Sequence, residues 1–296
     1  MVQQVKILEL GQLPGEPGWL GMQPCPVIAW GEGPASPAAD VVVPDLDTAR
    51  ALEQRIHTFP LTAMTLVQVL RSTELLPVAQ ALDMESLAYS TLQSGPEFAQ
   101  WKQHREDAGE IAPQSGEPIL LSREGSVVEA VLNRPATRNA LTVEIRDALV
   151  ELLQLLEADA SIETLRISAN GPCFSVGGEL REFGSLPDPA TAHWVRTVHS
   201  PARLLARLGS RVSCLVHGAC IGSGIELPAF AANVVAHKKT FFQLPELQLG
   251  LIPGAGGTVS IAHRIGRQRT ALMVLSGRRI NSHTALEWGL VDELVD

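Results

Sequence analysis

The first 44 residues contain three short apolar runs separated by turn-forming segments. The runs are VKILEL, PVIAW and DVVV, and the intervening segments GQLPGEPGW and GEGPASPAA are rich in glycine and proline. Short apolar runs that are bounded in this way are typical of strands joined by turns. The pattern therefore predicts a small β element at this end of the sequence.

From residue 45 the spacing of apolar positions becomes helical. Asp45 or Asp47 can cap a helix that begins DTARALEQRI, and Pro60 opens a second that runs through TAMTLVQVLR. A third helix is predicted over LLPVAQALDMESLAYSTLQ, and Pro96 starts a fourth, EFAQWKQHR.

The stretch EDAGEIAPQSGEP, residues 106–118, is polar and contains two prolines and two glycines. This composition favours a linker. We expect a boundary near Gly116, with an N-terminal extension of short strands and about four helices over residues 1–116 and a second domain over residues 117–296.

Strand and helix patterns alternate beyond this linker. ILLSREG and SVVEAVLN are predicted to form a hairpin, and LTVEIRDALVELLQLLEAD is a clear amphipathic helix. TLRISAN, SCLVHG and NVVAHK are short β-branched runs, each followed by a glycine-bearing turn or a helix. The alternation indicates an α/β domain with a largely parallel sheet.

Composition narrows the class of protein. The 296 residues are 45% hydrophobic and 19% charged, which is ordinary for a globular chain, and the net charge is −9. An acidic chain is not expected to bind nucleic acid or anionic membranes nonspecifically. No secretory signal and no apolar run of about 18 residues is visible, so we expect a cytoplasmic protein without a membrane partner. The four cysteines lack metal-ligand spacing, and no metal is expected: Cys25, Cys173, Cys214 and Cys220.

Glu226 stands in an otherwise apolar stretch, GACIGSGIELPAF, residues 218–230. A glutamate in apolar surroundings costs several kcal/mol unless it is paired, hydrogen-bonded or protonated. On this stretch alone, a helix-start glutamate stabilised by the helix dipole explains it.

Three further stretches change this interpretation. They are NRPATRNAL before the amphipathic helix, FSVGGEL with its adjacent glycines, and PELQLGLIPGAGG. Together with HGACIGSGIEL and the final GLVDELV, they resemble the motifs of the enoyl-CoA hydratase/isomerase (crotonase) superfamily in order and spacing, over about residues 118–296.

The resemblance implies a crotonase-like spiral of ββα turns and an acyl-CoA thioester as ligand, with coenzyme A as part of the substrate and no separate cofactor. It places the catalytic carboxylates at Glu226 and Glu246. The reactions of such thioesters pass through an enolate, whose oxygen two aimed N–H groups can stabilise. By motif position these donors are the amides of Gly178 and Ser223.

Further positions are expected to contact substrate or coenzyme A because they match the motifs. Arg138 is expected either to meet a coenzyme A phosphate, as basic residues at this family position can, or to be a solvated arginine in a turn, and segment 183–210 is expected to line the acyl pocket. The other expected contacts are Ala140, Ser175, Gly177, Glu179, Leu180, Gly222, Pro245 and Gly254.

Some polar residues outside the motifs receive no chemical role from the sequence. In the N-terminal part, Glu85, Ser86 and Tyr89 are interpreted as buried polar groups. His193 and His199 fit ordinary helix packing better than a metal site.

The family's chemistry leaves several reactions open. In its hydratases the residue matching Glu246 handles the α proton and the one matching Glu226 activates water, whereas double-bond isomerisation can use the former alone. Hydration or dehydration of a 2-enoyl-CoA is the leading interpretation. The alternatives are isomerisation, thioester hydrolysis, carbon–carbon cleavage, or a noncatalytic acyl-CoA binder.

The sequence also departs from the family pattern. Ser223 replaces a usual glycine and Glu179 a usual aspartate. Family members typically continue past GLVD into a helical segment that helps trimerise and closes over coenzyme A, whereas this sequence ends at Asp296 and has residues 1–116 in front. We expect the N-terminal helices to cover the surface that this segment would leave bare, and a homo-oligomer, by family default a trimer or hexamer.

Overall fold

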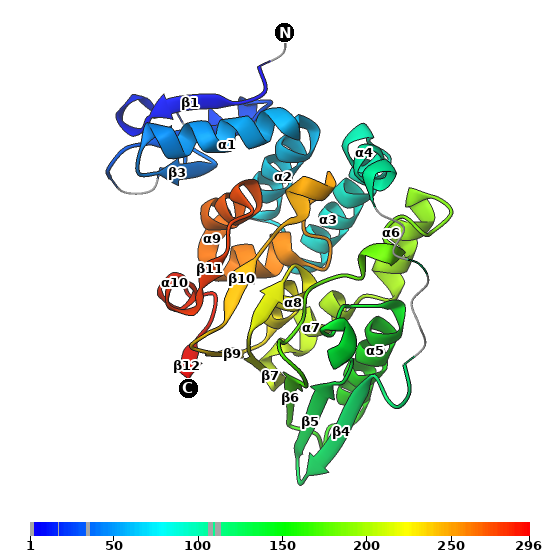
Figure 1. The fold of residues 1–296 in the computed structure, drawn as a ribbon. Helices are drawn as coiled ribbons and strands as arrows, with labels where there is room; N and C mark the ends of the chain where they lie inside the picture. Colours follow the sequence, from blue (N-terminus) through cyan, green and yellow to red (C-terminus); the bar gives the residue numbers. More distant parts are fainter. Residues whose placement is uncertain (1–2, 17, 34–35, 106–108, 110–113) are drawn as a thin grey trace.

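The computed structural model describes residues 3–16, 18–33, 36–105, 109 and 114–296. Most of the predicted linker, residues 106–108 and 110–113, lies outside the described residues. The chain forms an α/β fold in which two sheets lie at opposite ends of the molecule (Figure 1).

The N-terminal strands form a small parallel sheet. Strands β1 (Lys6–Glu9), β2 (Val27–Trp30) and β3 (Val41–Val43) pair in the order β1-β2-β3. They coincide with the three predicted apolar runs, so this prediction is confirmed. Their burial against α1 and α9 explains why the runs are almost wholly apolar.

The four predicted helices follow in order. They are α1 (Leu46–Thr58), α2 (Pro60–Thr73), α3 (Val78–Gln93) and α4 (Pro96–His104). Asp45 rather than Asp47 caps the first, since its Oδ1 accepts a hydrogen bond of 2.7 Å from the Thr48 amide.

The third helix begins three residues later than predicted, at Val78 rather than at Leu75. Pro77 supplies the reason, because a proline disfavours helical backbone in the residue before it. The helix therefore does not extend back over Leu75 and Leu76, and Pro77 is its N-cap residue.

A six-stranded sheet dominates the rest of the chain, with the strand order β12-β9-β7-β6-β5-β4. β4 pairs antiparallel with β5 as the predicted hairpin, and every other neighbouring pair is parallel. The strands are β4 (Ile119–Glu124), β5 (Val127–Leu132), β6 (Thr164–Ala169), β7 (Val212–Val216), β9 (Asn233–His237) and β12 (Glu293–Val295).

A second three-stranded sheet, β11-β10-β8, carries the segments that matter for function. β8 (Ala219–Ile221) and β10 (Phe241–Gln243) run parallel, and β11 (Ile280–Asn281) is antiparallel to β10. The chain leaves β8 into the short helix α8 (Ser223–Glu226) and leaves β10 toward the 3-10 helix Glu246–Leu249. Because parallel strands end at the same edge, the two segments that bear the glutamates are brought together.

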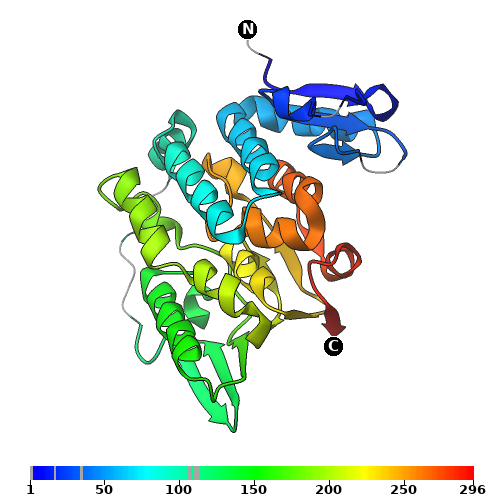
Figure 2. The same ribbon diagram turned by 180° about the vertical axis from the view of Figure 1, so that it is seen from behind.

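The remaining helices cover these sheets. α5 (Val143–Ala158) packs against α7 (Pro201–Leu208), and α6 (Pro189–Val198) packs against α3. α9 (Gly257–Ser276) is bent at Gly266 and is contacted by α1, α2 and α3, as Figure 2 shows from behind. α10 (Ser282–Trp288) precedes β12.

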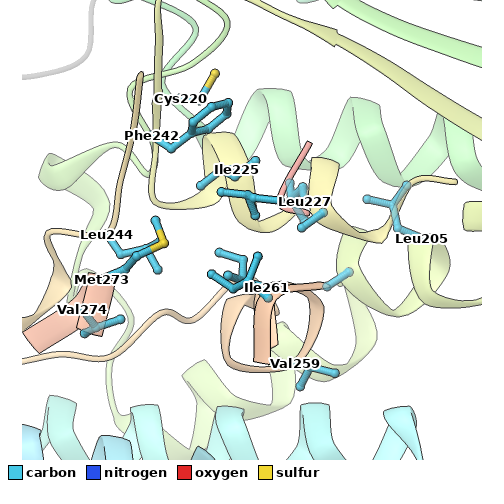
Figure 3. Packing of buried hydrophobic residues seen from close by; sticks show 14 of the residues in the cluster. Leu205, Cys220, Ile225, Leu227, Phe242, Leu244, Val259, Ile261, Met273 and Val274 are labelled. Carbon is cyan, nitrogen blue, oxygen red and sulfur yellow. The ribbon is translucent and has the colours of Figure 1, made fainter. Parts of the chain in front are cut away.

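One hydrophobic core joins the N-terminal helices to the rest of the chain. Leu66 of α2 and Leu82 of α3 belong to the same buried cluster as Ile225 and Val274. In Figure 3, Ile225 and Leu227 face Ile261 of α9. Helix α8 therefore packs against α9, and α9 in turn packs against the N-terminal helices α1, α2 and α3.

No helix in the described part of the chain is both long enough and apolar enough to cross a membrane.

Candidate active site

A cavity of about 790 Å³ lies between the N-terminal helices and the α8 segment. Residues of α3 and α4 form one wall, and the expected pocket segment contributes residues between Phe183 and His199. The cavity is also lined by six of the positions singled out from the motifs: Gly178, Glu179, Ser223, Glu226, Glu246 and Gly254.

Glu226 ends helix α8 and is only 3% exposed. Its Oε2 accepts hydrogen bonds from the amides of Ala255 at 2.8 Å and Gly257 at 2.9 Å. Burial raises the pKa of Glu226 well above its usual range, and the neighbouring carboxyls of Glu246 and Glu85 raise it further.

Glu246 begins the 3-10 helix after β10 and is buried as well. Its Oε2 has no hydrogen-bond partner among the described residues. Burial raises the pKa of Glu246 to about 8, with a further contribution from the charge of Glu85. A buried carboxyl oxygen without a donor is costly when ionised, so this environment favours the protonated form.

The two carboxyls face one point beside Gly222. A Cβ placed on Gly222 would lie 2.7 Å from Oε1 of Glu246 and 3.7 Å from Oε1 of Glu226. Only glycine fits there, because the backbone φ is +49° and a side chain would occupy the space between the carboxyls.

Gly178 and Ser223 both line the cavity. Neither N–H has an acceptor among the residues that the structure describes. Their loops are held together, because Ser175 accepts from Ile221 at 3.1 Å and a Cβ on Gly177 would lie 2.7 Å from the Ile221 carbonyl oxygen. The Ser223 hydroxyl is buried and also lacks a partner within the described chain.

The other motif-derived positions do not line this cavity. Ser175 and Gly177 lie behind the Gly178 loop, where the Gly177 amide donates to Ser175 Oγ at 3.1 Å. Arg138 and Leu180 are exposed, the former in a left-handed turn with φ 54°. The remaining three are Ala140, Gly222 and Pro245, which shape the backbone around the site.

Glu85 of α3, for which no chemical role was predicted from the sequence, lies beside the two carboxyls. It is 2% exposed and accepts hydrogen bonds from the amides of Gly256 at 2.7 Å and Thr258 at 2.9 Å, and from the Thr258 hydroxyl at 2.6 Å. Burial raises its pKa to about 7, against the lowering effect of these donors. One feature of the sequence could have indicated this site. Glu85 is an acidic residue on the apolar face of a predicted helix, one turn after the buried residues Ala81 and Leu82.

Tyr89, one turn further along α3, also lines the cavity. Its ring lies against Gly254, where an added Cβ would be only 2.4 Å from a ring carbon. The guanidinium carbon of Arg196 lies 4.6 Å from the ring centroid, a cation–π geometry. The N-terminal helices thus supply side chains to the site.

His193 makes a hydrogen bond of 2.9 Å between its Nδ1 and the Ser86 hydroxyl, in keeping with helix packing between α6 and α3. Among the described residues, no group of three or more His, Cys, Asp or Glu side chains is arranged to hold a metal ion.

Comparison with known proteins agrees with this geometry. The family model described as enoyl-CoA hydratase/isomerase matches residues 122–296. The chain is 35% identical over 179 residues to the 2,3-dehydroadipyl-CoA hydratase of Escherichia coli K12, covering 60% of this chain and 68% of that protein. It is 32% identical over 182 residues to the 1,2-epoxyphenylacetyl-CoA isomerase of the same organism, covering 60% and 70% respectively.

Solved structures show the same fold. An enoyl-CoA hydratase from Mycobacterium smegmatis superposes with a TM-score of 0.55 at 28% identity, covering 60% of this chain and 70% of the other. A structure from Geobacillus kaustophilus HTA426, described as an enoyl-CoA hydratase subunit, gives 0.56 at 26% identity, covering 60% and 69%.

The fold and the pair of buried glutamates define a crotonase-type enzyme. The chain belongs to the enoyl-CoA hydratase/isomerase family. The family model begins at residue 122, so α1 to α4 precede the matched region.

Proposed function

We propose that this enzyme hydrates a 2-enoyl-CoA thioester, or dehydrates the corresponding 3-hydroxyacyl-CoA. The main observation in support is that two buried carboxyls face one point in a cavity, which is also lined by two residues whose backbone amides have no acceptor within the described chain. The names of two relatives, a 2,3-dehydroadipyl-CoA hydratase and a 1,2-epoxyphenylacetyl-CoA isomerase, both state an acyl-CoA thioester, and the hydratase is named for a 2-enoyl-CoA.

The amides of Gly178 and Ser223 are proposed to bind the thioester oxygen. This oxygen gains negative charge as the double bond is attacked, and each preorganised donor stabilises it by about 3 to 4 kcal/mol. Ser223 also begins a helical turn, where backbone N–H groups point outward. Arg138, exposed beside the site's loops, is the proposed contact for a coenzyme A phosphate.

The two carboxyls are proposed to divide the proton transfers. Two amides donate to Oε2 of Glu226 and stabilise its anion against burial and the neighbouring charges, whereas Oε2 of Glu246 has no donor in the described chain, so Glu246 is proposed to be the carboxyl that holds the proton. Glu226 then takes a proton from water as the water oxygen bonds to the β carbon. Glu246 gives its proton to the α carbon as the enolate collapses, and solvent exchange restores both groups.

Isomerisation of a double bond is the second candidate. It is supported by the similarity to an enoyl-CoA isomerase/hydratase of Mycosarcoma maydis, 28% identical over 187 residues, and by the proposal that Glu246 alone moves the α proton. The two reactions differ in whether Glu226 is needed.

The test is turnover of a short and an aromatic 2-enoyl-CoA, followed by loss of the absorbance of the conjugated thioester. We expect wild-type turnover, and kcat lower by about 100- to 10,000-fold in both Glu226→Gln and Glu246→Gln. Double-bond migration that survives Glu226→Gln would instead assign the isomerase reaction. Tight binding of both thioesters with no turnover of either would refute the proposal.

A further inference from the structure

Two glutamates from distant parts of the chain, Glu85 and Glu226, accept hydrogen bonds from one short segment, residues 255–258. The amides of residues 255–258 alternate between them: Ala255 and Gly257 donate to Glu226, whereas Gly256 and Thr258 donate to Glu85. The alternation means that neither glutamate can shift without moving the segment that holds the other.

The segment has little freedom to adjust on its own. A Cβ on Gly257 would lie 2.6 Å from Cγ of Glu226, so the backbone is in direct contact with that side chain. The Ser260 hydroxyl donates to the Glu226 carbonyl at 2.7 Å, which ties α9 to α8. Movement of residues 255–258 is therefore transmitted to the Glu226 carboxyl group.

We propose that Glu85 is a positioning residue, which fixes residues 255–258 and through them the orientation of the Glu226 carboxylate toward substrate. The inference rests on the proposed function of Glu226. It gives the N-terminal extension a part in catalysis, because Glu85 lies before the region that the family model matches.

Charge is the second route by which Glu85 acts on the site. Its negative charge raises the pKa of both Glu226 and Glu246. The groups that face Glu85 or its surroundings come from several elements: Tyr89 on its own helix, Arg146, Arg196, His199 and Arg203 around the adjoining cavity, and the two catalytic glutamates. Removal of the Glu85 charge lowers the pKa of the catalytic carboxyls.

The experiment compares Glu85→Gln with a matched control, Glu97→Gln. Like Glu85, Glu97 of α4 accepts hydrogen bonds from two backbone amides and one threonine hydroxyl. The donors are the amides of Leu61 at 2.8 Å and Thr62 at 2.9 Å and the Thr62 hydroxyl at 2.6 Å. It holds the start of α2 instead of the start of α9. Both variants lose a carboxylate from the same kind of capping arrangement.

For Glu85→Gln we expect kcat to fall by about 10- to 100-fold, the cost of a small misplacement of a catalytic group. KM should change by less than about threefold, because the substrate-binding surface is kept. The kcat–pH profile should move to lower pH, and amide hydrogen exchange at residues 255–258 should accelerate. Glu97→Gln should lower the melting temperature and leave kcat and its pH profile within about twofold of wild type.

Unchanged kcat and pH profile in Glu85→Gln would overturn the proposal. Equal losses of activity in both variants, in proportion to lost stability, would overturn it as well.

If the wild type hydrates no enoyl-CoA, the proposed function fails separately. Exchange of the α protons of a saturated acyl-CoA in D2O then replaces turnover, with the same two variants and the same criteria. If that exchange is also absent, amide exchange at residues 255–258 decides, and unchanged exchange in Glu85→Gln overturns the proposal.

Discussion

Three glutamates lie close together in a part of the protein that water barely reaches. Each has a different set of partners: Glu85 has three donors, Glu226 two, and Glu246 has an oxygen with none in the described chain. Donors stabilise the anion and burial opposes it, so the three carboxyls differ in their tendency to ionise. In the proposed mechanism, this difference is what lets one carboxyl donate a proton and its neighbour accept one at the same pH.

The buried Glu246 makes stability depend on pH in a defined direction. Its pKa is raised from 4.5 to about 8, so between these values the folded protein holds a proton that the unfolded chain has lost. The free energy of unfolding must therefore fall as pH rises through this window. Glu246→Gln removes the contribution of this proton to the pH dependence of stability. Between pH 5 and pH 9 the melting temperature of the variant should therefore fall less than that of wild type. The difference should be about 2 to 4 °C for each kcal/mol that Glu246 contributes to the fall in the free energy of unfolding.

Glu144 provides a control, because its pKa is lowered in the folded protein and its contribution to stability therefore changes with pH in the opposite direction. Its hydrogen bond with Arg134 holds the pKa of Glu144 below its usual range, so its contribution is present above that range and is lost in acid. Glu144→Gln should lower the melting temperature at neutral pH and converge with wild type on acidification. The loss of melting temperature in Glu144→Gln is small because the side chain is half exposed.

For Glu246→Gln, a melting temperature that depends on pH in the same way as that of wild type would contradict the raised pKa of Glu246.

The sequence predicted part of the site and missed the rest for a physical reason. Glu226, Glu246, Gly178 and Ser223 stand in contiguous motifs whose spacing is visible along the chain. Glu85 has its donors 171 and 173 residues away, so nothing near it in sequence indicates what satisfies its charge. The structure places all five around residues 222–258, while their roles stay with the proposals above.

At the level of elements, the N-terminal helices are fitted closely to a glycine of the family motif. A Cβ on Gly250 would lie 2.5 Å from the Phe98 nitrogen and 2.6 Å from the Glu97 carbonyl carbon, both at the start of α4. Gly250 also has φ +69°, a conformation that favours glycine. The backbone of α4 therefore rests directly on the turn that follows the 3-10 helix of Glu246.

Gly250→Ala should displace α4 and lower stability. We expect the strain of a left-handed alanine plus a backbone clash, together about 2 to 5 kcal/mol in the free energy of unfolding by urea. Gly289→Ala is the matched control, because its φ is +83° and its nearest contact would be 3.6 Å. It should cost only the strain, about 1 to 2 kcal/mol. Equal losses in the two variants would show that α4 does not press on this turn.

Most elements were predictable because local pattern and tertiary burial agree. The N-terminal strands, the helices opened by Pro60 and Pro96, and the β4–β5 hairpin have boundaries set by nearby prolines, glycines or caps. The pairing of α3 with α6 and α9 was not predictable, since helix packing depends on surfaces brought together by the whole fold. The sequence alone also gave no reason to place Tyr89 beside Gly254.

On the scale of the whole molecule, the N-terminal helices and the family-matched region share one core. Deletion of residues 1–110 should therefore yield insoluble or aggregated protein, because it exposes the apolar faces that Leu66, Leu82 and their neighbours cover. The measurement is the soluble fraction on expression and its elution on size exclusion.

A separately expressed fragment of residues 1–110 is the control for this deletion. Supplied together with the remainder, it should restore soluble protein, because the contacts that join the two parts are noncovalent. A soluble, well-folded and active remnant without this fragment would contradict the prediction.

Because Glu85 is far in sequence from the amides that donate to it, the two are synthesised at different times. The ribosome makes Glu85 171 residues before Gly256, which takes roughly 10 to 30 s at usual elongation rates. During this interval the segment that donates to Glu85 does not yet exist. A nascent chain that stops before residue 255 therefore lacks the amides of Ala255 and Gly257 that donate to the Glu226 carboxylate.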